Sequence, residues 1–156
     1  MKSLKLFSPI RIGGCDLLNR FFVSPMCQYS ASEGRATDWH FVHYSALANS
    51  GAGMLVVEAA AVGVRGRITQ SDLGLYSDAC ESALGRIVEN CRRYGTAALG
   101  VQLAHAGRKG SATVPWRGGG PLGSEEGGWQ RSRRPHCRSI ETGPRHAKWR
   151  KTTSMR

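Results

Sequence analysis

Three short runs of apolar residues, without polar alternation, predict three buried strands in the first 130 residues. The runs cover residues 20–24, 54–60 and 97–103. Continuous runs of this kind are typical of parallel strands that are covered on both faces. Pro25 follows the first run and has no backbone N–H to donate, so the first strand should end there.

Between these runs, the apolar positions follow the 3.6-residue period of a helix. This period predicts one helix over residues 38–50, begun by Thr37 or Asp38 and stopped by Gly51. It predicts a second helix over residues 78–94, capped by Asp78. Strand, helix and strand at this spacing form βαβ units, so the three strands should be parallel, in chain order, with both helices on one face.

The remaining segments of the first 130 residues are predicted to be a hairpin and loops. Ile10 and Ile12 alternate with Arg11 before the turn residues Gly13 and Gly14, which predicts a β-hairpin within residues 9–19. Polar and glycine-rich composition predicts loops over residues 30–35, 63–77 and 110–130.

The amino-acid composition is that of one ordinary globular domain and agrees with the elements predicted above. The chain has 156 residues and no apolar stretch of about 18 residues, so we expect no membrane partner and a cytoplasmic location. Its five cysteines include no Cys-x-x-Cys pair, and an odd number favours reduced thiols over a disulfide framework.

The net charge of +11 belongs mainly to the last 26 residues. Residues 131–156 hold 9 Lys and Arg residues against the single acidic Glu141, and they contain no Leu, Val or Phe. Such a segment cannot bury an apolar face, so we predict a folded domain over residues 1–130 and a basic, disordered tail over residues 131–156. The alternative function class is therefore a nucleic-acid-binding module built on this tail, although Trp149 is its one aromatic residue.

Chemistry-bearing side chains follow the predicted strands, where parallel α/β folds place their sites. Met26 and Cys27 stand in the polar turn after the first strand, and Tyr29 offers a neutral phenolic donor two residues later. If the turn is extended, Cys27 and Tyr29 point the same way. Gln102 carries an amide donor and acceptor within an apolar strand, where it should have a partner. Three of these residues also have a purely structural interpretation. Met26 and Cys27 could pack in the hydrophobic core, and Tyr29 could be an ordinary surface residue.

Two histidines raise the question of a metal site. His40 and His43 lie at positions i and i+3 of the first predicted helix, on one face. No third ligand stands at helical spacing, so we predict no metal.

Four motifs, in order and spacing, resemble the Old Yellow Enzyme family, in particular its cysteine-containing, thermophilic-like branch. They are Ser24-Pro-Met-Cys-Gln-Tyr29, Val57-Glu-Ala59, Gly66-Arg-Ile-Thr69 and Gln102-Leu-Ala-His-Ala-Gly-Arg-Lys109. The resemblance implies an α/β fold that is part of a TIM (β/α)₈ barrel, with the N-terminal hairpin plugging its bottom. It also implies FMN as cofactor, NADPH or NADH as hydride donor, and NADPH dehydrogenase or ene-reductase activity on enones.

The same resemblance implies roles for individual residues. The flavin would be held by Ser24, Pro25, Met26, Cys27, Ala59 and Gln102. Cys27 would also tune the flavin potential, and Tyr29 would contact the substrate. The partner is then a small activated alkene, and full-length relatives are expected to be homo-oligomers.

The resemblance covers about residues 4–130, so we expect an N-terminal fragment with three strands of the eight. A complete barrel of this type needs about 250 residues. The family's catalytic histidine pair, flavin-contacting arginine and phosphate-binding loops lie in the part beyond. A shifted reading frame over residues 131–156 can encode segments similar to the family, which favours a frameshift origin for the tail. We therefore expect this chain alone to bind FMN weakly, to self-associate and to show no enone reduction.

Overall fold

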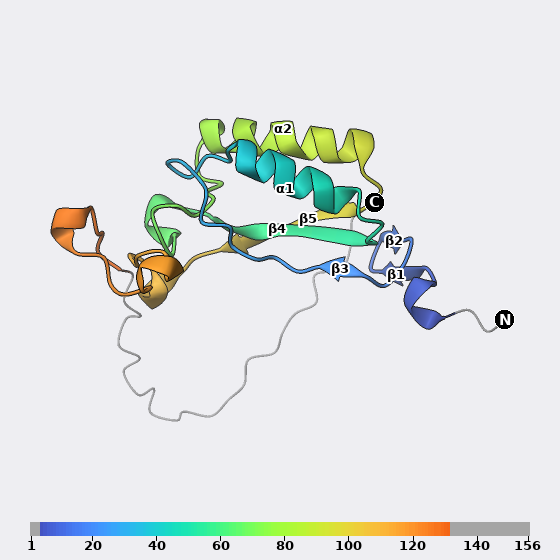
Figure 1. Ribbon diagram of the computed structural model, residues 1–156, viewed down its shortest axis with the longest axis horizontal. Coiled ribbons are helices and arrows are strands. Elements are labelled where there is room, and N and C mark those ends of the chain that lie inside the picture. Colours follow the sequence, from blue (N-terminus) through green and yellow to red (C-terminus); the bar gives the residue numbers. More distant parts are fainter. Residues whose placement is uncertain (1–3, 132–156) are drawn as a thin grey trace, which may run out of the picture.

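The computed structural model describes residues 4–131, in which two helices lie on one side of a three-stranded sheet (Figure 1). The strands are β3 (Phe22–Val23), β4 (Met54–Ala61) and β5 (Ala98–Ala104), and the helices are α1 (Asp38–Ala48) and α2 (Asp78–Tyr94). The strands are parallel, in the order β3-β4-β5. The predicted sheet, its order and the common side of the helices are confirmed.

The predicted N-terminal hairpin is also present. β1 (Ile10–Ile12) pairs antiparallel with β2 (Cys15–Leu17). Gly13 makes the turn with a φ of 56°, a left-handed conformation that glycine adopts without a steric penalty. Figure 1 shows the hairpin near the N-terminal ends of the sheet strands, at the opposite end from the loops that follow β4 and β5.

Single turns of 3-10 helix interrupt the long loops after β4 and β5. They are η2 (Val64–Gly66), η3 (Gly107–Lys109), η4 (Pro115–Arg117) and η5 (Ser124–Glu126); a further turn, η1 (Lys5–Phe7), precedes the hairpin. The loops at 63–77 and 110–130 therefore agree with the prediction except for these turns. The disordered tail was predicted over residues 131–156, and all of it except Arg131 lies outside the described residues.

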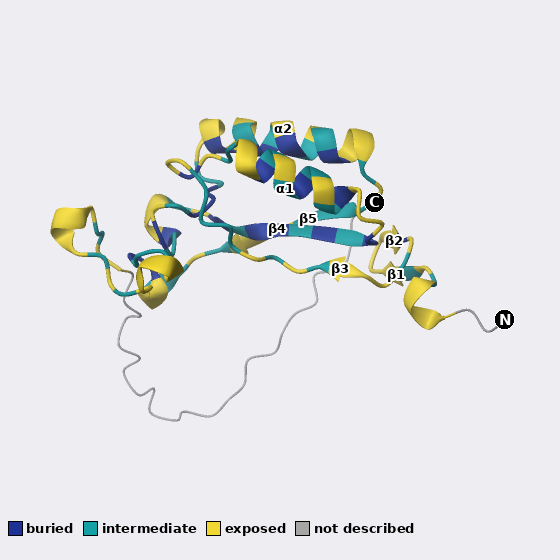
Figure 2. Ribbon diagram, viewed as in Figure 1, coloured by how far each residue is buried: buried dark blue, intermediate teal, exposed yellow. Residues whose placement is uncertain are grey.

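The core lies between the helices and the sheet, where Figure 2 shows the buried colour on β4 and on the inner sides of α1 and α2. Nine buried residues form it: Tyr44, Ala48, Leu55, Val57, Ala60, Leu73, Leu84, Ile87 and Cys91. The helical apolar stripes read from the sequence thus face the sheet, as expected for βαβ units.

Burial on both faces was the wrong expectation for β3, where Phe22 is 44% exposed. β5 is an edge strand of this sheet, and its residue Leu103 is 62% exposed. Within residues 4–131, the helices cover one face only and the sheet is open rather than closed into a barrel. The second face of this sheet is therefore not covered by any of the described residues.

Two helix ends differ from the sequence prediction. Ser77, not Asp78, is the N-cap of α2, and its Oγ accepts the Cys80 N–H at 3.3 Å. Asp78 instead lies in the first turn, where its charge favours the positive end of the helix dipole. α1 begins after Thr37, as predicted, but ends at Ala48, before Gly51.

No helix among the described residues is both long and apolar enough to span a bilayer. Over the same residues, Cys15, Cys27, Cys80 and Cys91 are free thiols.

Candidate functional site

The segment after β3 crosses the C-terminal end of β4 and is anchored there by a buried carboxylate. Glu58 of β4 accepts the backbone N–H of Gln28 through Oε2 at 2.8 Å. Gln28 also folds back, and its side-chain amide donates to the Met26 carbonyl at 2.9 Å. The turn that carries Cys27 is thus held to the sheet by a side chain from the neighbouring strand.

A β-bulge at Glu58 sets which side chains of β4 face the helices. Val57 pairs with Val101, but Ala59, not Glu58, pairs with Gln102, so Glu58 is the extra residue. Ala60 belongs to the core under the helices, and successive strand residues point to opposite faces. Ala59 and Gln102 therefore lie side by side on the face away from the helices.

Gln102 is exposed on this face, and no described residue forms a hydrogen bond with its side-chain amide. Because β5 is open to solvent there, the amide is available to water or to a ligand. Ser24 and Met26 are likewise exposed at the end of β3, and Pro25 is half-buried.

The thiol of Cys27 is half-buried beside Ala59, at the same end of the sheet. Burial is the main cause that raises its pKa from 9.0 to about 11, with smaller effects from the charges of Asp72 and Glu58. Hydrogen bonding with the backbone of Ala59 and of Cys27 itself opposes the shift. Cys27 is consequently a neutral thiol at physiological pH.

Tyr29 does not continue an extended turn, contrary to the sequence expectation. Its φ is 51°, a left-handed conformation that is uncommon for residues other than glycine and is found at strained functional sites. Its ring meets the Trp116 ring edge-on, with centroids 5.8 Å apart. Desolvation, followed by the charges of Cys27, Asp72 and Glu58, raises the pKa of the phenol, which therefore remains a hydrogen-bond donor.

Behind the Cys27 turn, Glu58 lies in a fully buried cluster with two residues of α1. The Tyr44 hydroxyl donates to Glu58 Oε1 at 2.9 Å and accepts the Glu58 backbone N–H at 3.1 Å. The His40 Nε2 atom lies 3.4 Å from the same carboxylate oxygen. Burial, first, and the charge of Glu58, second, raise the pKa of Tyr44. The cluster fixes Glu58, and Glu58 in turn fixes the turn at Gln28.

The two histidines considered as metal ligands serve other purposes. The Nδ1 atom of His40 accepts the Thr37 N–H at 3.0 Å, which places the ring proton on Nε2, toward Glu58. The His43 ring instead stacks on Trp39, with centroids 6.1 Å apart. Residues 4–131 contain no group of three His, Cys, Asp or Glu side chains suited to a metal ion.

A second buried carboxylate, Asp72, organises the loop after β4. It accepts the Ile68 N–H at 2.7 Å, and both the hydroxyl and the N–H of Thr69 at 2.6 and 3.2 Å. Desolvation raises the pKa of Asp72, while these hydrogen bonds oppose the rise. The Ser71 carbonyl then accepts the Ala31 N–H at 2.9 Å, which ties this loop to the Tyr29 segment.

The structure brings Cys27, Ala59 and Gln102 together near the C-terminal end of the sheet. Ser24, Pro25 and Met26 lie on the segment that leads from β3 to Cys27, and Tyr29 lies two residues beyond it. Their functional groups are a thiol, a phenol and an amide, all uncharged, with the carboxylates buried behind them. Such a surface suits a planar ligand with both donors and acceptors on its edge. Glu58, Tyr44 and His40 were missed as functional residues; the signal was a carboxylate inside an apolar strand, which needs buried partners.

Comparisons with known proteins agree with this geometry. A sequence model described as the NADH:flavin oxidoreductase / NADH oxidase family matches residues 5–126. An NADH:flavin oxidoreductase of Gibberella zeae is 44% identical over 128 residues, which cover 81% of this chain and 31% of the relative. An NADPH dehydrogenase of Bacillus subtilis is 45% identical over 107 residues, or 67% of this chain and 31% of the relative.

Solved structures show the same fold. The crystal structure of Old Yellow Enzyme from Pichia sp. AKU4542 matches with a TM-score of 0.65 and 27% identity, over 76% of this chain and 31% of that one. Morphinone reductase in complex with tetrahydroNAD matches with a TM-score of 0.63, over 70% and 29%, but at 24% identity it supports the fold alone. The chain spans about a third of the length of these relatives.

Proposed function

The chain belongs to the NADH:flavin oxidoreductase / NADH oxidase family, and from this premise we propose that residues 4–131 form the flavin-facing part of an FMN-dependent NAD(P)H oxidoreductase. The proposed reaction is reduction of the activated C=C bond of an enone. The names of the relatives support the flavin and the nicotinamide donor, and the enone is our extension.

The observation that carries the proposal is the arrangement of Cys27, Ala59 and Gln102. The bulge at Glu58 pairs Ala59 with Gln102 on the open face of the sheet, and the Cys27 thiol lies beside Ala59. Ala59 adds only a methyl group to this face, so a flat ring can approach the strand closely. Gln102 then presents an amide donor and acceptor to a ring edge that has both.

Each residue would have a separate task around FMN. When bound, FMN would supply the redox chemistry, taking a hydride from NAD(P)H and giving it to the β-carbon of an activated alkene, whose α-carbon would take a proton from water. Backbone and side-chain groups of Ser24, Pro25 and Met26 would hold the ring beside Ala59 and Gln102. Cys27, kept neutral by its raised pKa, would modulate the flavin potential as a weak thiol donor rather than as a thiolate.

Tyr29 would orient the substrate in this proposal. Its raised pKa keeps the phenolic proton in place, so the hydroxyl can donate to the carbonyl oxygen of an enone. The free thiols of the described residues fit a reducing compartment, and the proposal includes a cytoplasmic location and homo-oligomers of full-length relatives.

The test is titration of FMN into the purified 156-residue chain, followed by quenching of flavin fluorescence. Ala59→Leu should weaken binding by about tenfold or more, because the added side chain occupies the ring's position. The matched control is Ala46→Leu, at an exposed position of α1, which should leave binding unchanged. Equal FMN affinity for the Ala59→Leu and unsubstituted chains would refute the site assignment.

A second measurement tests turnover by this chain itself. We expect NADPH oxidation with 2-cyclohexenone to remain at the rate of free FMN, because in this proposal the described residues would contact only one part of the ring system. Turnover above that rate would show that these residues suffice for catalysis.

A further inference from the structure

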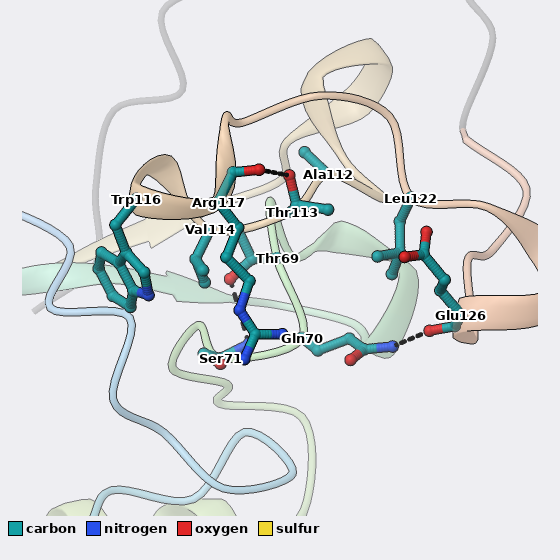
Figure 3. Close-up of a pocket in the computed structure, with 10 residues that line it drawn as sticks. All are labelled: Thr69, Gln70, Ser71, Ala112, Thr113, Val114, Trp116, Arg117, Leu122 and Glu126. Carbon is teal, nitrogen blue, oxygen red and sulfur yellow. Dashed lines mark hydrogen bonds between the residues drawn. The ribbon is translucent and has the colours of Figure 1, made fainter.

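A pocket of about 510 Å³ lies where the loops after β4 and β5 meet, next to Tyr29. The first loop contributes Ser71, and the second contributes Val114, Trp116, Arg117, Leu122 and Glu126. Figure 3 shows the Arg117 side chain extending from its turn toward the segment that carries Ser71. The volume lies within the range of small-molecule sites, about 300–1,000 Å³.

The one charged donor that lines the pocket is left without a protein partner among the described residues. Gln70 uses its amide N–H groups on the Glu126 and Gly127 carbonyls, and Thr69 donates its hydroxyl to Asp72. The Arg117 guanidinium, by contrast, makes no hydrogen bond or ion pair with any described residue. The exposed guanidinium of Arg117 is therefore free to pair with an anionic group of a ligand in this pocket.

An exposed aromatic ring stands beside this guanidinium. Trp116 is 67% exposed, although its ring also meets Tyr29 edge-on. Val114 and Leu122 add apolar surface to the same pocket. An apolar, partly aromatic wall beside a cation suits an unsaturated ligand body with an anionic end.

The charges in the pocket favour a single negative charge on the ligand. Arg117 is the one cation among the lining residues, and Glu126 lines the pocket as well. A phosphate dianion would bring a second negative charge, unmatched by Arg117, close to the Glu126 carboxylate. A ligand carboxylate carries one negative charge and can pair with one guanidinium in bidentate geometry.

We propose that this pocket binds the carboxylate of an unsaturated or aromatic carboxylic acid, paired with Arg117 and covered by Trp116. The ligand's remaining part would then lie toward Tyr29, which makes the pocket a specificity subsite for acidic substrates. This last step rests on the proposed function, whereas carboxylate binding itself does not.

The experiment measures binding of trans-cinnamate to the flavin-free 156-residue chain by saturation-transfer NMR. Arg117→Gln should weaken cinnamate binding by about tenfold, because a charge-assisted pair is lost. Arg92→Gln removes another exposed arginine, in α2 and away from the pocket, and should leave binding unchanged. Cinnamamide, the neutral isostere, should bind the unsubstituted chain about tenfold more weakly than cinnamate. Far-UV circular dichroism checks that each variant is folded.

Several outcomes would overturn the proposal. They are absence of cinnamate binding up to about 10 mM, equal cinnamate affinity in the Arg117→Gln chain, and equal affinity for cinnamamide. Stronger binding of adenosine 2′,5′-diphosphate at the same place would identify a phosphate site instead and refute the carboxylate. No flavin is present in this test, so its failure is separate from failure of the Ala59→Leu titration with FMN.

Discussion

Replacing Tyr44 by phenylalanine tests whether the buried cluster at Glu58 stabilises the fold. The change removes one hydroxyl and keeps the ring, which is 2% exposed within the core. That hydroxyl serves Glu58 twice, as donor to Oε1 at 2.9 Å and as acceptor of the backbone N–H at 3.1 Å. No solvent reaches the two groups that lose their partner, because Glu58 is fully buried.

The expected loss follows from these two hydrogen bonds. A hydrogen bond to a charged group contributes about 1.5–3 kcal/mol to stability, and a neutral one about 0.5–1.5 kcal/mol. The free energy of unfolding should therefore fall by about 2–4 kcal/mol in Tyr44→Phe. This is a large part of the stability of an ordinary domain, which is about 5–15 kcal/mol.

The measurement is urea unfolding of the unsubstituted and variant chains, followed by circular dichroism at low protein concentration. The matched control is Tyr94→Phe, at a tyrosine that is 60% exposed at the end of α2, and it should change stability by less than about 0.5 kcal/mol. If the free energy of unfolding falls as little in Tyr44→Phe as in this control, the hydroxyl does not stabilise Glu58 and the reasoning about the cluster is wrong.

Four other predictions follow from single features. Because the pKa of Cys27 is about 11 rather than 9.0, iodoacetamide at pH 8 should alkylate it about 100-fold more slowly in the folded chain than in urea, as measured by mass spectrometry. Because the pKa of Cys27 is higher in the folded chain, the unfolded chain loses the thiol proton at a lower pH, and the free energy of unfolding should decrease between pH 9 and 11. The decrease should be smaller in Cys27→Ser, and an equal decrease in both chains would contradict this prediction. Asp72→Asn should loosen the loop after β4 and speed its tryptic cleavage several-fold, whereas the exposed hairpin variant Asp16→Asn should not. Gly53→Ala should cost about 1–3 kcal/mol in urea unfolding, since its Cβ would meet a backbone oxygen, and Gly14→Ala, with open space around it, should cost little.

The regular elements could be predicted because their signals are local. Apolar period, the Gly13-Gly14 turn and βαβ handedness were enough for the hairpin, both helices and the parallel strand order. Burial was overestimated at Phe22, because a continuous apolar run does not tell how many faces the rest of the described chain covers.

The residues of the candidate site could be proposed from the sequence, but their geometry could not. Motif resemblance identified Cys27, Ala59 and Gln102, yet it gave no sign of the bulge that sets Ala59 opposite Gln102. The left-handed Tyr29 was missed as well, since propensity disfavours that conformation and tertiary contacts with Trp116 and the loop override it. Such features depend on partners far along the chain, which no local pattern reports.

The bulge at Glu58 also has a consequence for mutagenesis libraries and for sequence alignment. Before it, odd-numbered residues such as Leu55 and Val57 face the helices; after it, the even-numbered Ala60 does. Two adjacent alanines thus differ in tolerance: Ala59 can be varied to reshape the open face, while Ala60, fully buried, has no room for a larger side chain. An alignment that shifts this strand by one position would exchange the two and direct a library at the core instead of at the open face of the sheet.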